Sequence, residues 1–246
     1  MKLAYQYDDN FTDLKNYFLS NIQDDFELIC SKLEKPHIDS NANFVDKIGG
    51  GIDYWIGNTK YLLSILDSCK EDEYFMFSDV DIVFFKPILP TINKLIGDHD
   101  ALFSREVPFG KVPWQGGDIA GNINFGFIVM RSCDRSKSFL KDLLFTIENQ
   151  KILNQIVVNR LLYGSSNYNL KWDLLPVEFT NTNFFGPLWP TDLIGSVPTD
   201  LNKEHKLVNK NSLTFHAIYP IDPISKMNLL KFAVETVKKD ENNNQF

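Results

Sequence analysis

The sequence EYFMFSDVDIVFFKP, residues 73–87, contains two apolar runs separated by an acidic triplet. Each run has the length of a buried strand, and the first is predicted to be a central parallel strand. Asp79 and Asp81 follow that strand directly, at the edge of the sheet where ligands bind in open α/β folds. Neighbouring carboxylates repel each other unless a cation lies between them or one is protonated. Since hard cations prefer oxygen ligands, the triplet indicates a metal site; a solvated turn is the alternative.

Around this stretch, segments typical of strands and helices alternate along the chain. Strands are predicted at 2–7, 26–33, 100–104, 123–131, 171–176 and 212–219, and helices at 12–22, 53–68, 90–97, 135–148 and 152–163. This alternation predicts an α/β fold with a mostly parallel sheet. We expect a single domain over residues 1–246, with a disordered polar tail at about 238–246.

The composition excludes several classes of protein. A net charge of −7 argues against nucleic acid as the partner, because phosphate backbones are bound by clustered Lys and Arg. The three cysteines lack a CxxC spacing, so neither a disulfide framework nor a zinc site is expected. The chain contains no run of 18 apolar residues and begins without a signal peptide. We therefore expect no membrane span and a cytoplasmic location.

Further motifs follow the triplet in a recognisable order. Residues 122–132, NINFGFIVMRS, match the pattern N-x-G-x-x-x-x-[RN], Asn154 and Gln155 follow in a helical region, and His216 comes late in the chain. Together with the triplet these motifs resemble the DxD glycosyltransferases of the GT-A fold, in particular the nucleotide-diphospho-sugar transferases and the glycogenin-like retaining enzymes. The resemblance implies a single GT-A domain, whose mostly parallel central sheet is flanked by helices and carries a small antiparallel addition.

The resemblance also implies a reaction and a metal. The enzyme would transfer a sugar from a UDP-sugar to a hydroxyl of a glycan or other acceptor, and the resemblance favours retention. The expected lack of a membrane span, and not the resemblance, suggests a bacterial or viral source. Asp79, Asp81 and His216 would bind Mn²⁺ or Mg²⁺, with Asp81 as the most direct ligand. Asp79 would be a ligand or a ribose contact, and the alternative for His216 is a structural hydrogen-bonding role.

Other residues are candidates for binding the nucleotide. Tyr5, Gln6 and Tyr7 end the first predicted strand, where they would bind the base or form an aromatic edge of the core. Lys60 lies in the helix 53–68, whose predicted buried stripe includes Ile56, and would reach the diphosphate or the aspartates. A solvated helix face is its alternative. The resemblance makes Lys226 a second candidate for the diphosphate.

The predicted catalytic residues are Gln115, Asp118, Asn154 and Gln155. Gln115 and Asp118 belong to the Gly-rich segment 105–122, which is long enough to be a functional loop and is expected to cover the donor sugar. Asp118 would serve as the general base if the reaction inverts the anomeric centre. Asn154 occupies a position where the family has Asp, so its role is open.

Two other functions use similar features. A sugar-1-phosphate nucleotidyltransferase also has acidic pairs, but such enzymes carry a Gly-rich basic loop after the first strand, whereas residues 5–13, YQYDDNFTD, contain no Gly, Arg or Lys. A non-catalytic carbohydrate-binding protein on the same fold would have no use for a complete set of metal ligands.

Overall fold

A computed structural model describes residues 1–33, 52–106, 112–113, 120–164, 169–179, 208–218 and 222–242. Its main sheet has six strands in the order β2-β1-β3-β8-β5-β9. Their bounds are Lys2–Tyr7 (β1), Glu27–Lys32 (β2), Tyr74–Ser78 (β3), Ala101–Arg105 (β5), Ile123–Arg131 (β8) and Trp172–Leu174 (β9). All neighbours pair in parallel except β8, which runs antiparallel to β3 and β5. The mostly parallel sheet and the central place of β3 are therefore confirmed.

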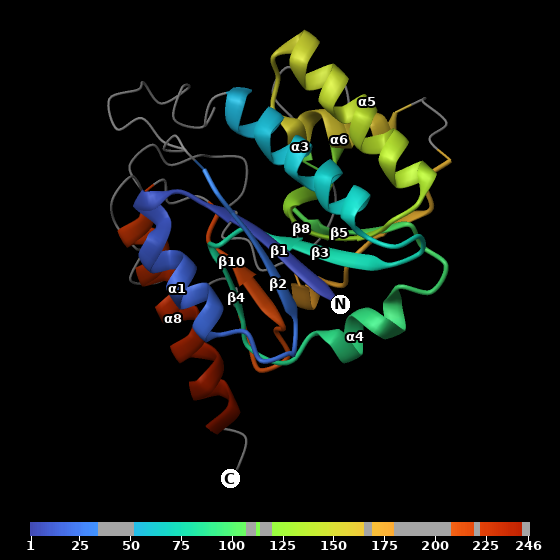
Figure 1. Ribbon diagram of the computed structural model, residues 1–246. Coiled ribbons are helices and arrows are strands. Elements are labelled where there is room, and N and C mark those ends of the chain that lie inside the picture. Colours follow the sequence, from blue (N-terminus) through green and yellow to red (C-terminus); the bar gives the residue numbers. More distant parts are fainter. Residues whose placement is uncertain are drawn as a thin grey trace.

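Two small antiparallel sheets are added to this framework. β4 (Ile82–Phe84) pairs with β10 (Thr214–His216), and β6 (Val112–Pro113) pairs with β7 (Ala120–Gly121). β4 follows β3 after the acidic triplet, and β10 comes from near the end of the described chain, so their pairing brings distant sequence to the triplet (Figure 1). The expected antiparallel addition is thus confirmed.

Helices cover both faces of the main sheet (Figure 1). One face carries α3 (Ile52–Ser68), α5 (Asp134–Gln150) and α6 (Asn154–Tyr163). The other carries α1 (Thr12–Ser20) and α8 (Pro223–Asn242), which pack against each other. A shorter helix, α4 (Leu89–Leu95), and two 3-10 turns, η1 (Asp9–Phe11) and η2 (Val177–Phe179), complete the described elements.

The sheet separates two hydrophobic cores. Successive side chains of a strand point to opposite faces, and β3 shows this directly: Met76 packs in the core beneath α1 and α8, whereas Phe75 and Phe77 pack in the core beneath α3 and α5. Because both faces are covered, β3 is apolar along its length instead of alternating with polar residues. This burial holds the carboxyl end of β3, and hence the triplet, in a fixed position.

Two details differ from the sequence-based expectations. Helix α8 extends to Asn242, into the segment expected to be a disordered tail, and buries Leu229, Ala233 and Val237 along one side. In α3 the buried stripe contains Trp55, Leu62, Ile65 and Leu66, while Ile56 is only half-buried.

Among the helices that the structure describes, none is long and apolar enough to cross a membrane. Residues 36–51, a predicted loop that ends in three consecutive glycines, lie outside the described residues.

Candidate active site

Asp79 and Asp81 occupy the short connection between β3 and β4. Val80 between them is buried in the core, so the two carboxyl groups are directed away from it. The backbone of the connection is held on both sides: Asp79 N–H donates to Gly126 C=O (2.7 Å), and Ala217 N–H donates to Asp81 C=O (2.9 Å). The second bond, with the pairing of His216 and Ile82, brings the end of β10 alongside the triplet.

Together Asp79, Asp81 and His216 form a compact group, the Asp–Asp–His cluster. One potential ligand atom from each residue lies within 4.8 Å of the others. His216 Nε2 is 3.0 Å from Asp81 Oδ1 and 3.8 Å from Asp79 Oδ2. Asp81 Oδ1 is buried, yet it accepts no well-directed hydrogen bond from the part of the chain that the structure describes. Oxygen ligands with an imidazole, and an oxygen in need of a partner, fit a divalent cation such as Mn²⁺ or Mg²⁺.

The two carboxyl groups differ in charge state. Burial, followed by the charge of Asp81, raises the pKa of Asp79 to about 7. Burial acts in the same direction on Asp81, but Lys226 and His216 outweigh it and hold the pKa of Asp81 below its usual range. Without a metal, Asp81 is the permanently ionised member and Asp79 is the one that gains or loses a proton near neutrality.

Lys226 lies in the first turns of α8 and is 7% exposed. Its Nζ donates to Asp81 Oδ2 (2.5 Å), to Ala217 C=O (2.6 Å) and to Ile218 C=O (3.2 Å). Lys226 thus neutralises Asp81 through one oxygen and leaves the other, Oδ1, facing the cluster. Hydrogen bonds of this kind orient metal-ligating carboxylates. Its contact with a diphosphate stays a prediction.

Gly126 in β8 provides the space for the cluster. Phe103 of β5 pairs with Ile128 of β8, but the next residue, Ser104, pairs with Asn124, so β8 bulges between these positions. A Cβ atom on Gly126 would lie 2.5 Å from both Asp79 Oδ2 and His216 Cε1. Bulges often redirect side chains beside active sites. This bulge places Gly126, which has no side chain, against two of the potential ligands.

A pocket of about 150 Å³ adjoins the cluster at Asp79. It is formed by the beginning of α3, the end of β3, the bulge of β8 and the beginning of α6. Its described lining consists of Tyr54, Trp55, Asn58, Phe77, Asp79, Phe125, Gly126, Leu153, Asn154 and Gln155. Aromatic walls with a few amide groups are typical of small-molecule sites. Asn154 and Gln155, two of the predicted catalytic residues, thus line the pocket that adjoins the cluster, and their catalytic roles stay predictions.

Gln155 is held at both ends of its side-chain amide. Its Oε1 accepts from Phe125 N–H (3.2 Å), and its Nε2 donates to Glu106 Oε2 (2.9 Å). Asn154 Oδ1 accepts from Gln155 N–H at the start of α6 (2.8 Å). Glu106, Tyr54 and the pocket-lining Asn58 were not singled out by the sequence. The sequence signal for Glu106 was only its place two residues beyond the predicted strand 100–104.

The candidates at the end of β1 are divided between core and pocket. Tyr5 packs against Phe18 beneath α1, with ring centroids 5.5 Å apart, so it is a core residue. Gln6 points to the opposite face, where its Oε1 accepts from the pocket-lining Asn58 (3.0 Å). The ring of Tyr7 lies under Lys15 Nζ, 4.9 Å from the ring centroid.

Lys60 is not brought to the cluster. Lys60 Nζ pairs with Glu148 of α5 (3.0 Å) and the lysine side chain is 58% exposed, which is the solvated helix face rather than a diphosphate contact. In α3 it lies two residues beyond Asn58, which places it on the far side of the helix from the pocket. Gln115 and Asp118 lie outside the described residues, and their catalytic roles stay predictions.

The pKa of Asp79 predicts how the metal-free protein responds to pH. The folded state holds the Asp79 proton up to about pH 7, whereas the usual value is 3.8, so the folded state binds more protons between these values. Its stability should fall as pH rises through this interval, moderated by water because 32% of the side chain is exposed. In metal-free thermal denaturation at increasing pH across this interval, we expect the thermal midpoint of the wild type to decline more than that of Asp79→Asn. Parallel declines would contradict the assignment.

A sheet of this topology, with two aspartates after β3 and a histidine from β10 beside a pocket, defines an enzyme of the GT-A fold class. A sequence profile described as nucleotide-diphospho-sugar transferase matches residues 64–230, more than half of the chain. The chain belongs to the nucleotide-diphospho-sugar transferase family, and the predicted glycosyltransferase class is confirmed.

Solved structures support the fold at low sequence identity. A glycosyltransferase involved in glycosylation of the major capsid of PBCV-1 superposes with a TM-score of 0.52 at 8% identity, covering 94% of this chain and 100% of that one. The galactosyltransferase LgtC, in complex with donor and acceptor sugar analogues, gives a TM-score of 0.50 at 12% identity, covering 95% and 96%. No curated protein sequence matches the chain.

Proposed function

We propose that this protein is a metal-dependent glycosyltransferase that transfers a sugar from a UDP-sugar to an acceptor hydroxyl. The observation that carries the proposal is the Asp–Asp–His cluster beside a pocket in a member of the nucleotide-diphospho-sugar transferase family, with a buried Asp81 oxygen that accepts no well-directed hydrogen bond from the described residues. The cluster would bind the metal next to the diphosphate, and the pocket would hold the sugar.

The residues of the site have distinct tasks in this proposal. Asp79, Asp81 and His216 would hold Mn²⁺ or Mg²⁺, which neutralises the negative charge that grows on the diphosphate as the glycosidic bond breaks. Lys226 keeps Asp81 ionised and oriented. The amide of Gln155, fixed from both ends, would bind the donor sugar beside its reacting carbon.

Retention of configuration is the stereochemical outcome that we propose. Among the described residues that line the pocket, the only acidic side chain is Asp79, and it is assigned to the metal. An inverting reaction needs a separate general base on the acceptor. The candidate for that role is Asp118, so an inverted product from the wild type, together with loss of activity in Asp118→Asn, would overturn this part of the proposal.

Donor turnover tests the function directly. The wild type is incubated with UDP-glucose, UDP-galactose, UDP-N-acetylglucosamine and GDP-mannose, each with Mn²⁺ or with EDTA, and the released nucleoside diphosphate is quantified. We expect UDP release from a UDP-sugar with Mn²⁺ and none with EDTA. Pyrophosphate formation from UTP and a sugar-1-phosphate would instead indicate a nucleotidyltransferase. Binding of UDP-sugars without any turnover would indicate a carbohydrate-binding protein.

A further inference from the structure

We propose that Glu106 is a positioning residue that fixes the amide groups of Gln155 and Asn124, and so ties the sugar pocket to the metal cluster. The inference rests on the proposed function and adds to it a residue outside the described pocket lining. Glu106 directly follows β5 and is 4% exposed. Burying a carboxyl group to this extent destabilises the folded state unless the group is hydrogen-bonded.

A single oxygen of Glu106 holds both amides. Oε2 accepts from Asn124 Nδ2 (2.8 Å) and from Gln155 Nε2 (2.9 Å). The two donors come from β8 and α6, which are far apart in sequence from each other and from the end of β5. Hydrogen bonds to a carboxyl oxygen are among the stronger ones in proteins. Glu106 is therefore the point at which three separate segments of the site are joined.

The orientation of each amide follows from its other partner. The backbone N–H of Phe125 can only donate, so the atom of Gln155 that faces it is the oxygen, and the NH₂ group is left to face Glu106. In the same way Gly126 N–H donates to Asn124 Oδ1 (2.9 Å), which leaves the NH₂ group of Asn124 for Glu106. Neither amide can turn over without losing a hydrogen bond at each end.

The Asn124 branch leads to the metal cluster. Gly126 is bonded to Asn124 through its N–H and to Asp79 through its C=O (2.7 Å). The same glycine faces the side chains of Asp79 and His216. Glu106 thus supports the pocket through Gln155 and the bulge beside the cluster through Asn124. A small shift in either branch would misplace the sugar relative to the diphosphate, and misplacement of about 1 Å can cost about 10²-fold in rate.

The test compares Glu106→Met, which removes the acceptor, with Glu106→Gln, whose side-chain oxygen can still accept both amides. UDP release is measured with the UDP-sugar that the wild type turns over. We expect Glu106→Met to lower kcat by about 10- to 100-fold, the usual effect of losing a group that orients a ligand or catalytic residue. Glu106→Gln should recover most of that loss.

A double-mutant cycle shows whether Glu106 acts through Gln155. If it does, Glu106→Met combined with Gln155→Ala should be no slower than the slower single variant, because coupled residues are not additive. Additive losses would overturn the proposal. Equal inactivation by Glu106→Gln and Glu106→Met would also overturn it, because a lost charge rather than lost positioning would then be responsible.

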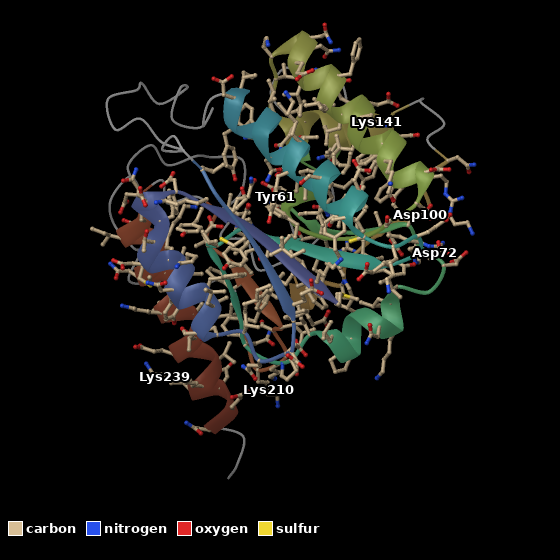
Figure 2. All side chains as sticks on the ribbon, in the orientation of Figure 1. Tyr61, Asp72, Asp100, Lys141, Lys210 and Lys239 are labelled. Atoms are coloured by element: carbon tan, nitrogen blue, oxygen red, sulfur yellow. The ribbon has the colours of Figure 1, made fainter. Side chains whose placement is uncertain are left out.

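Asp100→Asn is the matched control for a merely structural role. Asp100 is a fully buried carboxylate at the opposite end of β5, bonded by Arg135 Nε (2.6 Å) and Nη2 (2.7 Å), and it lies near Asp72 at the margin of the sheet (Figure 2). We expect this variant to lower the thermal midpoint and leave kcat of the folded enzyme unchanged. If Glu106→Met behaves in the same way, Glu106 is only structural.

Nuclear magnetic resonance gives a readout that needs no turnover. The side-chain NH₂ signals of Gln155, identified by their absence in Gln155→Ala, should shift in Glu106→Met and return toward their wild-type positions in Glu106→Gln. An unchanged signal in Glu106→Met would overturn the positioning role even if the wild type released no UDP. A wild type without UDP release but with these shifts would instead contradict the proposed function alone.

Discussion

Asp81→Asn is expected to abolish Mn²⁺-dependent release of UDP. Asp81 is the ionised member of the cluster, and its buried Oδ1 lies 3.0 Å from His216 Nε2 without accepting a well-directed hydrogen bond from the described residues. Asparagine keeps the shape of the side chain but removes the charge that a hard cation requires. Loss of charge stabilisation at a developing oxyanion costs about 10²–10³-fold in rate, and we expect at least that reduction. Steady-state UDP release and calorimetric titration with Mn²⁺ are the measurements.

The buried partner of Asp81 complicates a simple truncation. Asp81→Asn and Asp81→Ala would both leave the Lys226 ammonium buried without its carboxylate, and breaking such a pair costs about 3–5 kcal/mol. Loss of activity in either single variant has therefore to be separated from unfolding. Asp81→Asn combined with Lys226→Met removes both charges, so its stability should recover while Mn²⁺ binding does not. Turnover by Asp81→Asn within about tenfold of the wild type would contradict the metal assignment.

The position of the acidic pair could be predicted because it depends on local sequence. An apolar strand that is buried on both faces ends at a definite residue, and Asp79 follows it immediately. His216 was predicted from the resemblance, and the antiparallel pairing of β10 with β4 explains how a residue so late in the chain reaches Asp81. For these residues the order of motifs along the chain is enough.

The interior of the site could not be predicted in the same way. Asn124 lies opposite Ser104, and so near Glu106, because β8 bulges, and no local pattern in the sequence indicates that bulge. Lys60 was misplaced for a different reason. The apolar residues of α3 are so numerous that more than one buried stripe fits them, and the stripe chosen from Ile56 was turned by about one residue from the observed stripe at Trp55.

Gly126→Ala is expected to eliminate Mn²⁺ binding although it adds only one methyl group. The new Cβ would lie 2.5 Å from Asp79 Oδ2 and from His216 Cε1, closer than carbon atoms tolerate. Gly126 is held by hydrogen bonds on both sides, to Asn124 and to Asp79, so the backbone cannot easily retreat. Two of the three potential ligands would have to move, and displacement of about 1 Å at a reacting centre costs about 10²-fold in rate.

Gly57→Ala is the matched control for this substitution. Gly57 lies within α3, and a Cβ atom there would meet nothing within 4 Å. Because alanine favours a helix over glycine by about 1 kcal/mol, this variant should be at least as stable as the wild type and fully active. Wild-type Mn²⁺ affinity in Gly126→Ala would show that the cluster does not hold the metal. Loss of Mn²⁺ binding in Gly126→Ala with a retained thermal midpoint would locate the metal beside Gly126, since the added methyl group lies against the side chains of Asp79 and His216 and, at 3.1 Å, Asn124 Oδ1.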